Sequence, residues 1–244
     1  MPRRSSPLDD LLSFGGRVPP VVGGLIVALV LASILGAVST PLAGLGAFVP
    51  AAVLGGQVWR LVTWPFFERD PLSLLFGGLM LYWFGRDLTW AWGPRRFLTT
   101  FFVIAGLAAA VTTLLSFVLP TLGERVWLGA WPVLSALVIA WSMLFPERQI
   151  LFMFALPMSG RALGWITLGG TLLYAVFAGR GGAFQYVPHL AAQGLMALYL
   201  RGVSARGLWQ TLKIRQLERK ARRRASHLKV VQKDGGNDRP RWMN

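Results

Sequence analysis

The chain has 244 residues, of which 54% are hydrophobic and 14% are charged, and its mean hydropathy is +0.52. A soluble domain carries about 25% charged residues, so this composition excludes an ordinary soluble protein. The absence of cysteine excludes disulfides, thiolate metal sites and a cysteine nucleophile, and only two histidines occur. The apolar residues form long blocks, which predict a helical membrane protein. No metal ion or cofactor is expected, because the sequence shows no cluster of metal-ligand type and no nucleotide-binding glycine fingerprint.

A net charge of +15 would suit nucleic-acid binding, but the distribution of the charge favours a membrane surface. Residues 201–244 hold 13 Lys or Arg against 3 Asp or Glu, so +10 of the +15 lies in one tail that follows a hydrophobic segment. Such a tail typically faces anionic lipid on the cytoplasmic side of a membrane. Membrane lipids are therefore an expected partner, and nucleic acid is not.

The first predicted element is a transmembrane helix over about 19–40, which follows a short cytoplasmic N-terminus of residues 1–18. Its apolar stretch is about as long as a bilayer crossing needs at roughly 1.5 Å per residue. The alternative is a signal peptide, because two arginines precede the stretch. Two intervening aspartates and the lack of a convincing small-residue cleavage site favour a retained span.

A connection over 41–71 follows, and it is too aromatic for a solvated loop. Its Trp59–Arg60 pair suits the membrane interface, where indole rings and arginine side chains are both stable. The short apolar run within 146–161 cannot cross a membrane and predicts a second interfacial segment. Further apolar blocks predict spans at about 72–90, 97–119, 127–145, 161–179 and 184–201. The predicted fold is an all-α membrane domain of six spans over 19–201.

Six spans place both termini on one side of the membrane, and the positive-inside rule makes that side the cytoplasm. The loops on the opposite side carry only Arg60, Arg69, Arg125 and Arg180. No organelle signal is recognised, so a multi-pass protein of a bacterial inner membrane is expected.

Beyond the spans, residues 202–230 have the composition of a basic amphipathic helix, which is expected to lie on the inner leaflet or to recruit a partner. The basic residues that would contact lipid or a partner are Arg215, Arg219, Lys220, Arg222, Arg223 and Arg224. A contact with RNA or a ribosome is the weaker alternative. The last residues, 231–244, have a disordered composition.

Several short motifs follow one another in a distinctive order. In chain order they are Gln-Val-Trp-Arg-Leu-Val-Thr at 57–63, Phe-Gly-Arg-Asp-Leu at 84–88, Gly-Pro-Arg-Arg-Phe at 93–97, Gly-Ala at 129–130, Phe-Pro-Glu-Arg at 145–148 and Pro-His-Leu at 188–190. This pattern resembles the rhomboid superfamily of intramembrane serine proteases over nearly all of residues 20–201. The resemblance implies a six-helix bundle with a water-accessible cavity on its outer side.

In active rhomboids a Gly-x-Ser-Gly motif on the fourth span supplies the nucleophile, and a histidine on the sixth span is its base. Here the nucleophile position is Trp131, and an indole cannot attack a carbonyl group. On the second span the histidine and asparagine that hold the oxyanion align with Ser73 and Gly77. Of the catalytic set His189 alone remains, so the resemblance implies a catalytically inactive rhomboid pseudoprotease.

Ser135 is the alternative nucleophile, because it lies one helical turn beyond Trp131 on the same face. A transmembrane serine more commonly bonds to its own backbone, which is the favoured interpretation. For His189 a structural hydrogen bond is favoured over a catalytic relic or a ligand contact. Trp131 is either a plug in the ancestral cavity or an interfacial anchor like Trp127.

The Trp59–Arg60 pair is expected to fix the first loop at the interface, with direct contact to a client as the alternative. Gln193 is expected to bond to a neighbouring helix. Four glycines predict close approach of helices: Gly77, Gly78, Gly169 and Gly170.

The leading functional hypothesis is a non-catalytic adaptor, derlin-like in role, that binds transmembrane segments of other proteins for client handling or quality control. The rhomboid-like fold implies a lateral route for a helix even though the proteolytic chemistry is absent. One alternative is a permanent accessory subunit of a larger membrane complex. The other is a residual intramembrane protease that uses Ser135 and His189.

Overall fold

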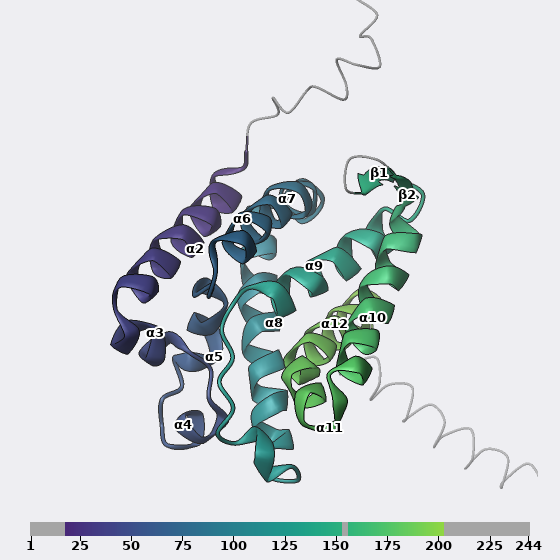
Figure 1. Cartoon of the computed structure of the whole chain (residues 1–244). Helices are drawn as coiled ribbons and strands as arrows, with labels where there is room; N and C mark the ends of the chain where they lie inside the picture. The colour runs from purple at the N-terminus through teal and green to yellow at the C-terminus, as the bar shows by residue number, and fades with distance from the viewer. Residues whose placement is uncertain (1–17, 153–155, 203–244) are drawn as a thin grey trace, which may run out of the picture. The chain divides into compact units, whose positions relative to one another are not determined.

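Apolar helices make up most of the part of the chain that the computed structural model describes, residues 18–152 and 156–202 (Figure 1). In chain order they are α2 (Pro20–Val38), α3 (Thr40–Gly46), α4 (Pro50–Leu54), α5 (Arg60–Thr63), η1 (Trp64–Phe66), α6 (Pro71–Met80), the π-helical turn η2 (Leu81–Gly85), α7 (Arg86–Trp92), α8 (Pro94–Leu115), η3 (Pro120–Leu122), α9 (Trp131–Leu144), α10 (Gly160–Phe177), α11 (Gly179–Gly182), η4 (Ala183–Tyr186) and α12 (Val187–Leu200).

Each of the six apolar segments predicted from the sequence contains a helix. Proline stands at the first or second position of α2, α6, α8, α9 and α12, where its fixed φ suits a helix start and its missing N–H is not needed. Within the described residues, two helices are long and apolar enough to cross a membrane, namely α2 with 19 residues and α8 with 22.

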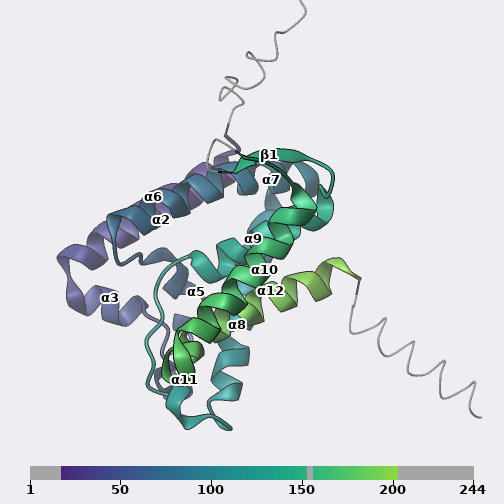
Figure 2. The same cartoon turned by 45° about the vertical axis from the view of Figure 1, so that its right-hand side comes forward.

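The second predicted segment is one rod formed by α6, η2 and α7 in succession. It ends at Gly93, whose φ of 83° stops the helix, and Pro94 then starts α8. α2 lies beside this rod (Figures 1 and 2). One side of α2 remains open, with Val27, Leu31 and Val38 exposed, as expected for a helix that faces lipid.

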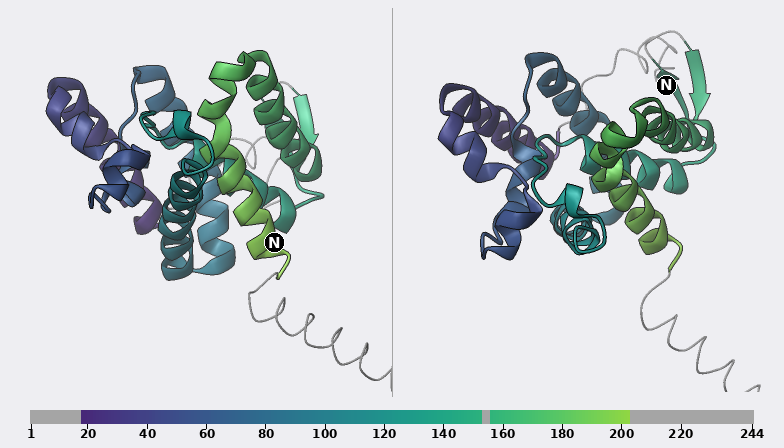
Figure 3. Two further views of the ribbon diagram at one scale, coloured as in Figure 1. Left: turned by 90° about the horizontal axis from the view of Figure 1, so that it is seen from below. Right: turned by 60° about the horizontal axis from the view of Figure 1, so that its bottom comes forward.

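α9 is the central helix, because α6, α7, α8, α10 and α12 all pack against it. Ten of its 14 residues are buried. At about 1.5 Å per residue it is shorter than the roughly 30 Å hydrocarbon core of a bilayer, and other helices cover most of its surface. α2 and α10 lie on opposite sides of the bundle (Figures 1 and 3).

The first connection folds into α3, α4, α5 and η1 and is joined to the segment before α9. Phe48 and Trp127 exchange two backbone hydrogen bonds of 2.9 Å, and their rings lie 5.3 Å apart. The Trp127 indole is 1% exposed and donates to the carbonyl oxygen of Gln185 at 3.0 Å. The expectation that Trp127 is an interfacial anchor is therefore wrong, because the ring is part of the core.

The expectation of an all-α domain is wrong in one place. The segment predicted to lie in the interface forms an antiparallel hairpin of β1 (Gln149–Phe152) and β2 (Leu156–Ser159). Its apolar run is too short to cross a membrane, and the two strands satisfy their backbone groups by pairing with each other.

Close helix packing depends on two glycines that the sequence analysis did not single out. A Cβ on Gly160 would meet the carbonyl oxygen of Phe145, and a Cβ on Gly164 would meet the Ser142 hydroxyl. The first turns of α10 therefore approach α9 only because both residues lack side chains. By contrast, nothing lies within 4 Å of a Cβ on Gly169 or Gly170, so the expectation of close packing there is wrong.

The expected interhelical bond of Gln193 is present, because its Nε2 donates to Thr171 Oγ1 of α10 at 2.8 Å. The chain divides into two units, residues 1–201 and 202–244. The predicted basic helix with its six named Arg and Lys residues and the predicted tail 231–244 lie outside the described residues, except for Gly202.

Candidate functional site

The Gly129–Ala130 motif, which corresponds to the rhomboid nucleophile motif of the fourth span, lies where the chain enters α9. Gly129 has a φ of 104°, which residues with a side chain rarely adopt, and its N–H donates to the carbonyl oxygen of Trp64 at 3.1 Å. The N–H of Ala130 donates to Glu68 Oε1 at 2.7 Å. A carboxylate from the first connection therefore occupies the N-terminal end of α9.

Gly129 makes room for Glu68, and Gly77 lies in ordinary contact distance of it. A Cβ on Gly129 would lie 2.8 Å from Glu68 Oε2, which is closer than such atoms approach. A Cβ on Gly77 would lie 3.7 Å from Glu68 Oε1 and 3.5 Å and 3.6 Å from the side chains of Leu29 and Leu134. Glu68 thus lies where α2, α6 and α9 meet, and Gly77, predicted as a lost oxyanion position, lies beside it.

Glu68 is also tied to α2 through Ser33. The Glu68 N–H donates to Ser33 Oγ at 3.0 Å, and the Ser33 hydroxyl donates to the carbonyl oxygen of Phe66 at 3.1 Å. Burial raises the pKa of the Glu68 carboxyl; the hydrogen bond from Ala130 opposes this effect and the nearby Asp70 adds to it. The partial positive charge at a helix N-terminus favours the ionised form. Glu68 therefore contacts two helices, α9 through its partly buried carboxylate and α2 through its backbone N–H.

Sequence reasoning missed Glu68, because its partners are distant in the chain. Ala130 is 62 positions away and Ser33 is 35 away. The available signal was an acidic residue in a connection that is otherwise rich in aromatic side chains and directly precedes an apolar segment.

The two candidate nucleophile positions lie on α9. Trp131 is half-buried at the first position of the helix. The Ser135 hydroxyl donates to the carbonyl oxygen of Pro132 at 2.8 Å, which is the local backbone bond expected for a serine in such a helix.

His189 lies near the start of α12, and its ring centroid is 5.5 Å from that of Tyr186. Its Nδ1 atom is buried without a hydrogen-bond partner, so the structural hydrogen bond expected for His189 is not made through this nitrogen. No hydrogen bond joins His189 to Ser135 in the part of the chain that the structure describes. Within the same residues, no three His, Asp or Glu side chains gather in a way that could hold a metal ion.

Ser73, the other predicted oxyanion position, is engaged at the start of α6. Its backbone N–H donates to Asp70 Oδ1 at 2.8 Å, which makes Asp70 the N-cap of the helix. This hydrogen bond lowers the pKa of the Asp70 carboxyl. The structure therefore gives Ser73 a role in helix capping.

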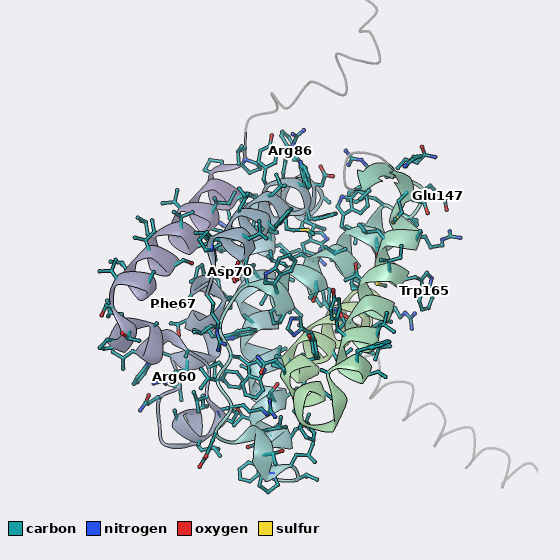
Figure 4. All side chains as sticks on the ribbon, in the orientation of Figure 1. Arg60, Phe67, Asp70, Arg86, Glu147 and Trp165 are labelled. Carbon is teal, nitrogen blue, oxygen red and sulfur yellow. The ribbon has the colours of Figure 1, made fainter. Side chains whose placement is uncertain are left out.

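The Trp59–Arg60 pair fastens α5 to α3. The Arg60 guanidinium is buried and donates to the carbonyl oxygens of Gly44 and Ala47, the second at 2.6 Å, and also to Gln57 Oε1 at 2.6 Å. The Trp59 indole donates to the carbonyl oxygen of Leu45 at 3.2 Å. Both side chains thus bind carbonyl groups at or just beyond the end of α3 (Arg60 is labelled in Figure 4).

An apolar groove runs between α2 and α6 and has a volume of about 460 Å³. Leu75, one of its lining residues, is 65% exposed, and Gly78, another, contributes no side chain. The residues that line it are Ile26, Val30, Pro71, Leu74, Leu75, Gly78, Leu79 and Tyr82. None of them carries a charge, so the groove suits hydrocarbon.

Residues 23–203 match the model of one protein family, DUF1751, described as a eukaryotic integral membrane protein. No curated protein matches the chain. The description contradicts the expected location in a bacterial inner membrane. That expectation rested on the absence of organelle signals, and such an absence does not identify a membrane.

Proposed function

Because the chain belongs to the DUF1751 family of integral membrane proteins, we propose that it is a rhomboid-like, six-span protein without proteolytic activity that binds transmembrane segments of other proteins. The proposed spans are α2, the rod of α6 to α7, α8, α9, α10 and α12. The occurrence of a helix in each of the six apolar segments supports this assignment.

The chemistry at the start of α9 supports the absence of proteolysis. Trp131 has no hydroxyl group with which to form an acyl intermediate. The amide of Ala130, a potential donor to an oxyanion, already binds Glu68. Ser135 bonds to its own helix and not to a base.

The groove between α2 and α6 is the observation that carries the binding role. Its lining residues on α6 run from Pro71 to Leu79, which is more than two helical turns. Its side chains are entirely apolar apart from the Tyr82 hydroxyl. Gly78 allows the backbone of a second helix to come close, which is how transmembrane helices pack. A client helix would displace lipid chains from this groove.

Photo-crosslinking tests the binding role. With a photoreactive benzophenone amino acid in place of Leu75, we expect adducts with many membrane proteins in native membranes. The matched control is Leu173 on α10, which is 58% exposed, compared with 65% for Leu75, but lies outside the groove. Gly78→Leu, which fills the groove, is expected to reduce the adducts at position 75 several-fold.

Equal adducts at positions 75 and 173 would contradict the groove as a client site. A single partner captured in near-equal amount would instead favour a permanent accessory subunit of a membrane complex. Immunoblots and quantitative mass spectrometry of the adducts distinguish these outcomes.

Residual proteolysis is tested by labelling with a serine-directed fluorophosphonate. We expect no labelling under conditions in which an active rhomboid reacts, because Ser135 and His189 share no hydrogen bond in the described residues. Labelling that disappears in both Ser135→Ala and His189→Ala would overturn the non-catalytic assignment.

A further inference from the structure

A shallow cavity of about 430 Å³ opens where α7 begins and α9 ends. Its walls come from α7 and from the segment that follows α9, and its residues are Arg86, Asp87, Trp90, Ala91, Phe145 and Arg148. Figure 4 shows Arg86 at the same end of the bundle as Glu147, the neighbour of Arg148. Neither the proposed client groove nor the start of α9 includes any of these residues.

Arg148 is held in place before any ligand binds. Asp87 Oδ2 accepts hydrogen bonds of 2.8 Å from both Arg148 Nη1 and Trp141 Nε1. The guanidinium also lies over the rings of Trp141 and Phe145, 5.9 Å and 5.7 Å from their centroids. Its other N–H groups remain available, and little side-chain entropy is lost when they bind an acceptor.

Arg86 is the second cation of the cavity. Its guanidinium makes no hydrogen bond or ion pair with any other described residue, although the residue is partly buried. Arg86, Arg148 and Asp87 together give the cavity a net charge of +1. A ligand with one negative charge and several acceptor oxygens would therefore neutralise the site.

The cavity lies at the end of the bundle where α2 and α8 begin, which is a membrane surface if these two helices span the membrane as proposed above. Gly85, next to Arg86, packs against Val22 at the start of α2, where a Cβ would lie 3.5 Å from a Val22 methyl group. α8 begins at this end too, directly after α7. Trp90 at the cavity is 74% exposed, as is typical of a tryptophan in the headgroup region.

We propose that this cavity binds the phosphodiester group of an anionic membrane phospholipid. Arg86 and Arg148 would donate hydrogen bonds to the phosphate oxygens, and Trp90 would lie against the glycerol backbone. Guanidinium groups suit this role because their N–H groups match the geometry of phosphate oxygens. The surrounding bilayer supplies such a lipid at high local concentration.

Native mass spectrometry of the full chain in detergent, titrated with phosphatidylglycerol, tests this proposal. We expect Arg86→Gln to weaken lipid retention about ten-fold, equivalent to about 1.4 kcal/mol. The matched control is Arg95→Gln, which removes an exposed arginine at the same end of the bundle but outside the cavity. Thermal unfolding without added lipid should be the same for both variants, which excludes misfolding as the cause.

Phosphatidylcholine is expected to bind more weakly than phosphatidylglycerol. Equal losses in the two variants, or equal binding of the two lipids, would overturn the proposal. Displacement of phosphatidylglycerol by millimolar inorganic phosphate would also overturn it, because the site would then recognise free phosphate and not a lipid.

Discussion

Replacing Gly160 by alanine is expected to lower the free energy of unfolding by about 1–3 kcal/mol, the usual cost of inserting a methyl group into a packed core. The added Cβ would meet the carbonyl oxygen of Phe145 and approach the Trp141 ring. A backbone carbonyl cannot turn away as a flexible side chain can, so α10 would have to move off α9.

The matched control is Gly169→Ala on the same helix, where nothing lies within 4 Å of the added Cβ. Alanine favours helix over glycine by about 1 kcal/mol, so this variant should be neutral or slightly stabilised. Thermal unfolding in detergent measures both. Equal midpoints for the two variants would show that the close approach at Gly160 contributes nothing to stability.

Two substitutions of Glu68 should have different effects at neutral pH. Glu68→Ala leaves the N–H of Ala130 without its acceptor and is expected to cost about 1–3 kcal/mol. Glu68→Gln keeps a side-chain oxygen for this bond and removes the partly buried charge, so its stability should stay within about 1 kcal/mol of the original. If Glu68→Ala is as stable as Glu68→Gln, the bond to α9 is unimportant.

The stability difference between the original protein and Glu68→Gln is expected to depend on pH. Burial raises the pKa of Glu68 above its ordinary value of 4.5, so the folded chain binds the proton more tightly than the unfolded chain does. Above the folded pKa the charged carboxylate therefore destabilises the fold. As the pH falls through the folded pKa towards 4.5, the original protein should gain stability relative to Glu68→Gln.

Measurements of the free energy of unfolding of both proteins between pH 7 and about 4.5 test the expected direction of this change. Asp70 does not interfere, because its pKa is lowered from 3.8 and it stays ionised throughout this range. A difference between the two proteins that does not change with pH would contradict the raised pKa of Glu68.

The helical segments could be predicted because they depend on local composition. Uninterrupted apolar blocks predicted the position of each helix to within a few residues. The prolines at or near the starts, such as Pro20, Pro94 and Pro188, are a second local signal that was not used. The segment of the hairpin was recognised as too short to cross a membrane, but four-residue strands are too short for a reliable period.

The contacts of the site could not be predicted, because they join distant parts of the chain. Gly160 and Gly164 look like any other glycines until α10 is placed against α9, whereas Gly169 has the same sequence character and faces open space. In the same way, Glu68 gains its importance only from Ala130 and Ser33. Periodicity shows which face of a helix is apolar but not which neighbour that face meets.

The π-helical turn η2 changes the direction in which side chains point around the rod, so the side chains of α6 and those of α7 face different neighbours. A π turn holds one residue more than an α turn, and each residue of an α-helix turns the side-chain direction by about 100°. The azimuth of Arg86 and Trp90 around the rod is therefore offset from that of Leu75 and Gly78 by this additional residue. In an uninterrupted α-helix the directions of the groove residues and of the cavity residues would follow from one constant rotation per residue. With η2 between them, the groove residues of α6 face α2 and the cavity residues of α7 face the end of α9.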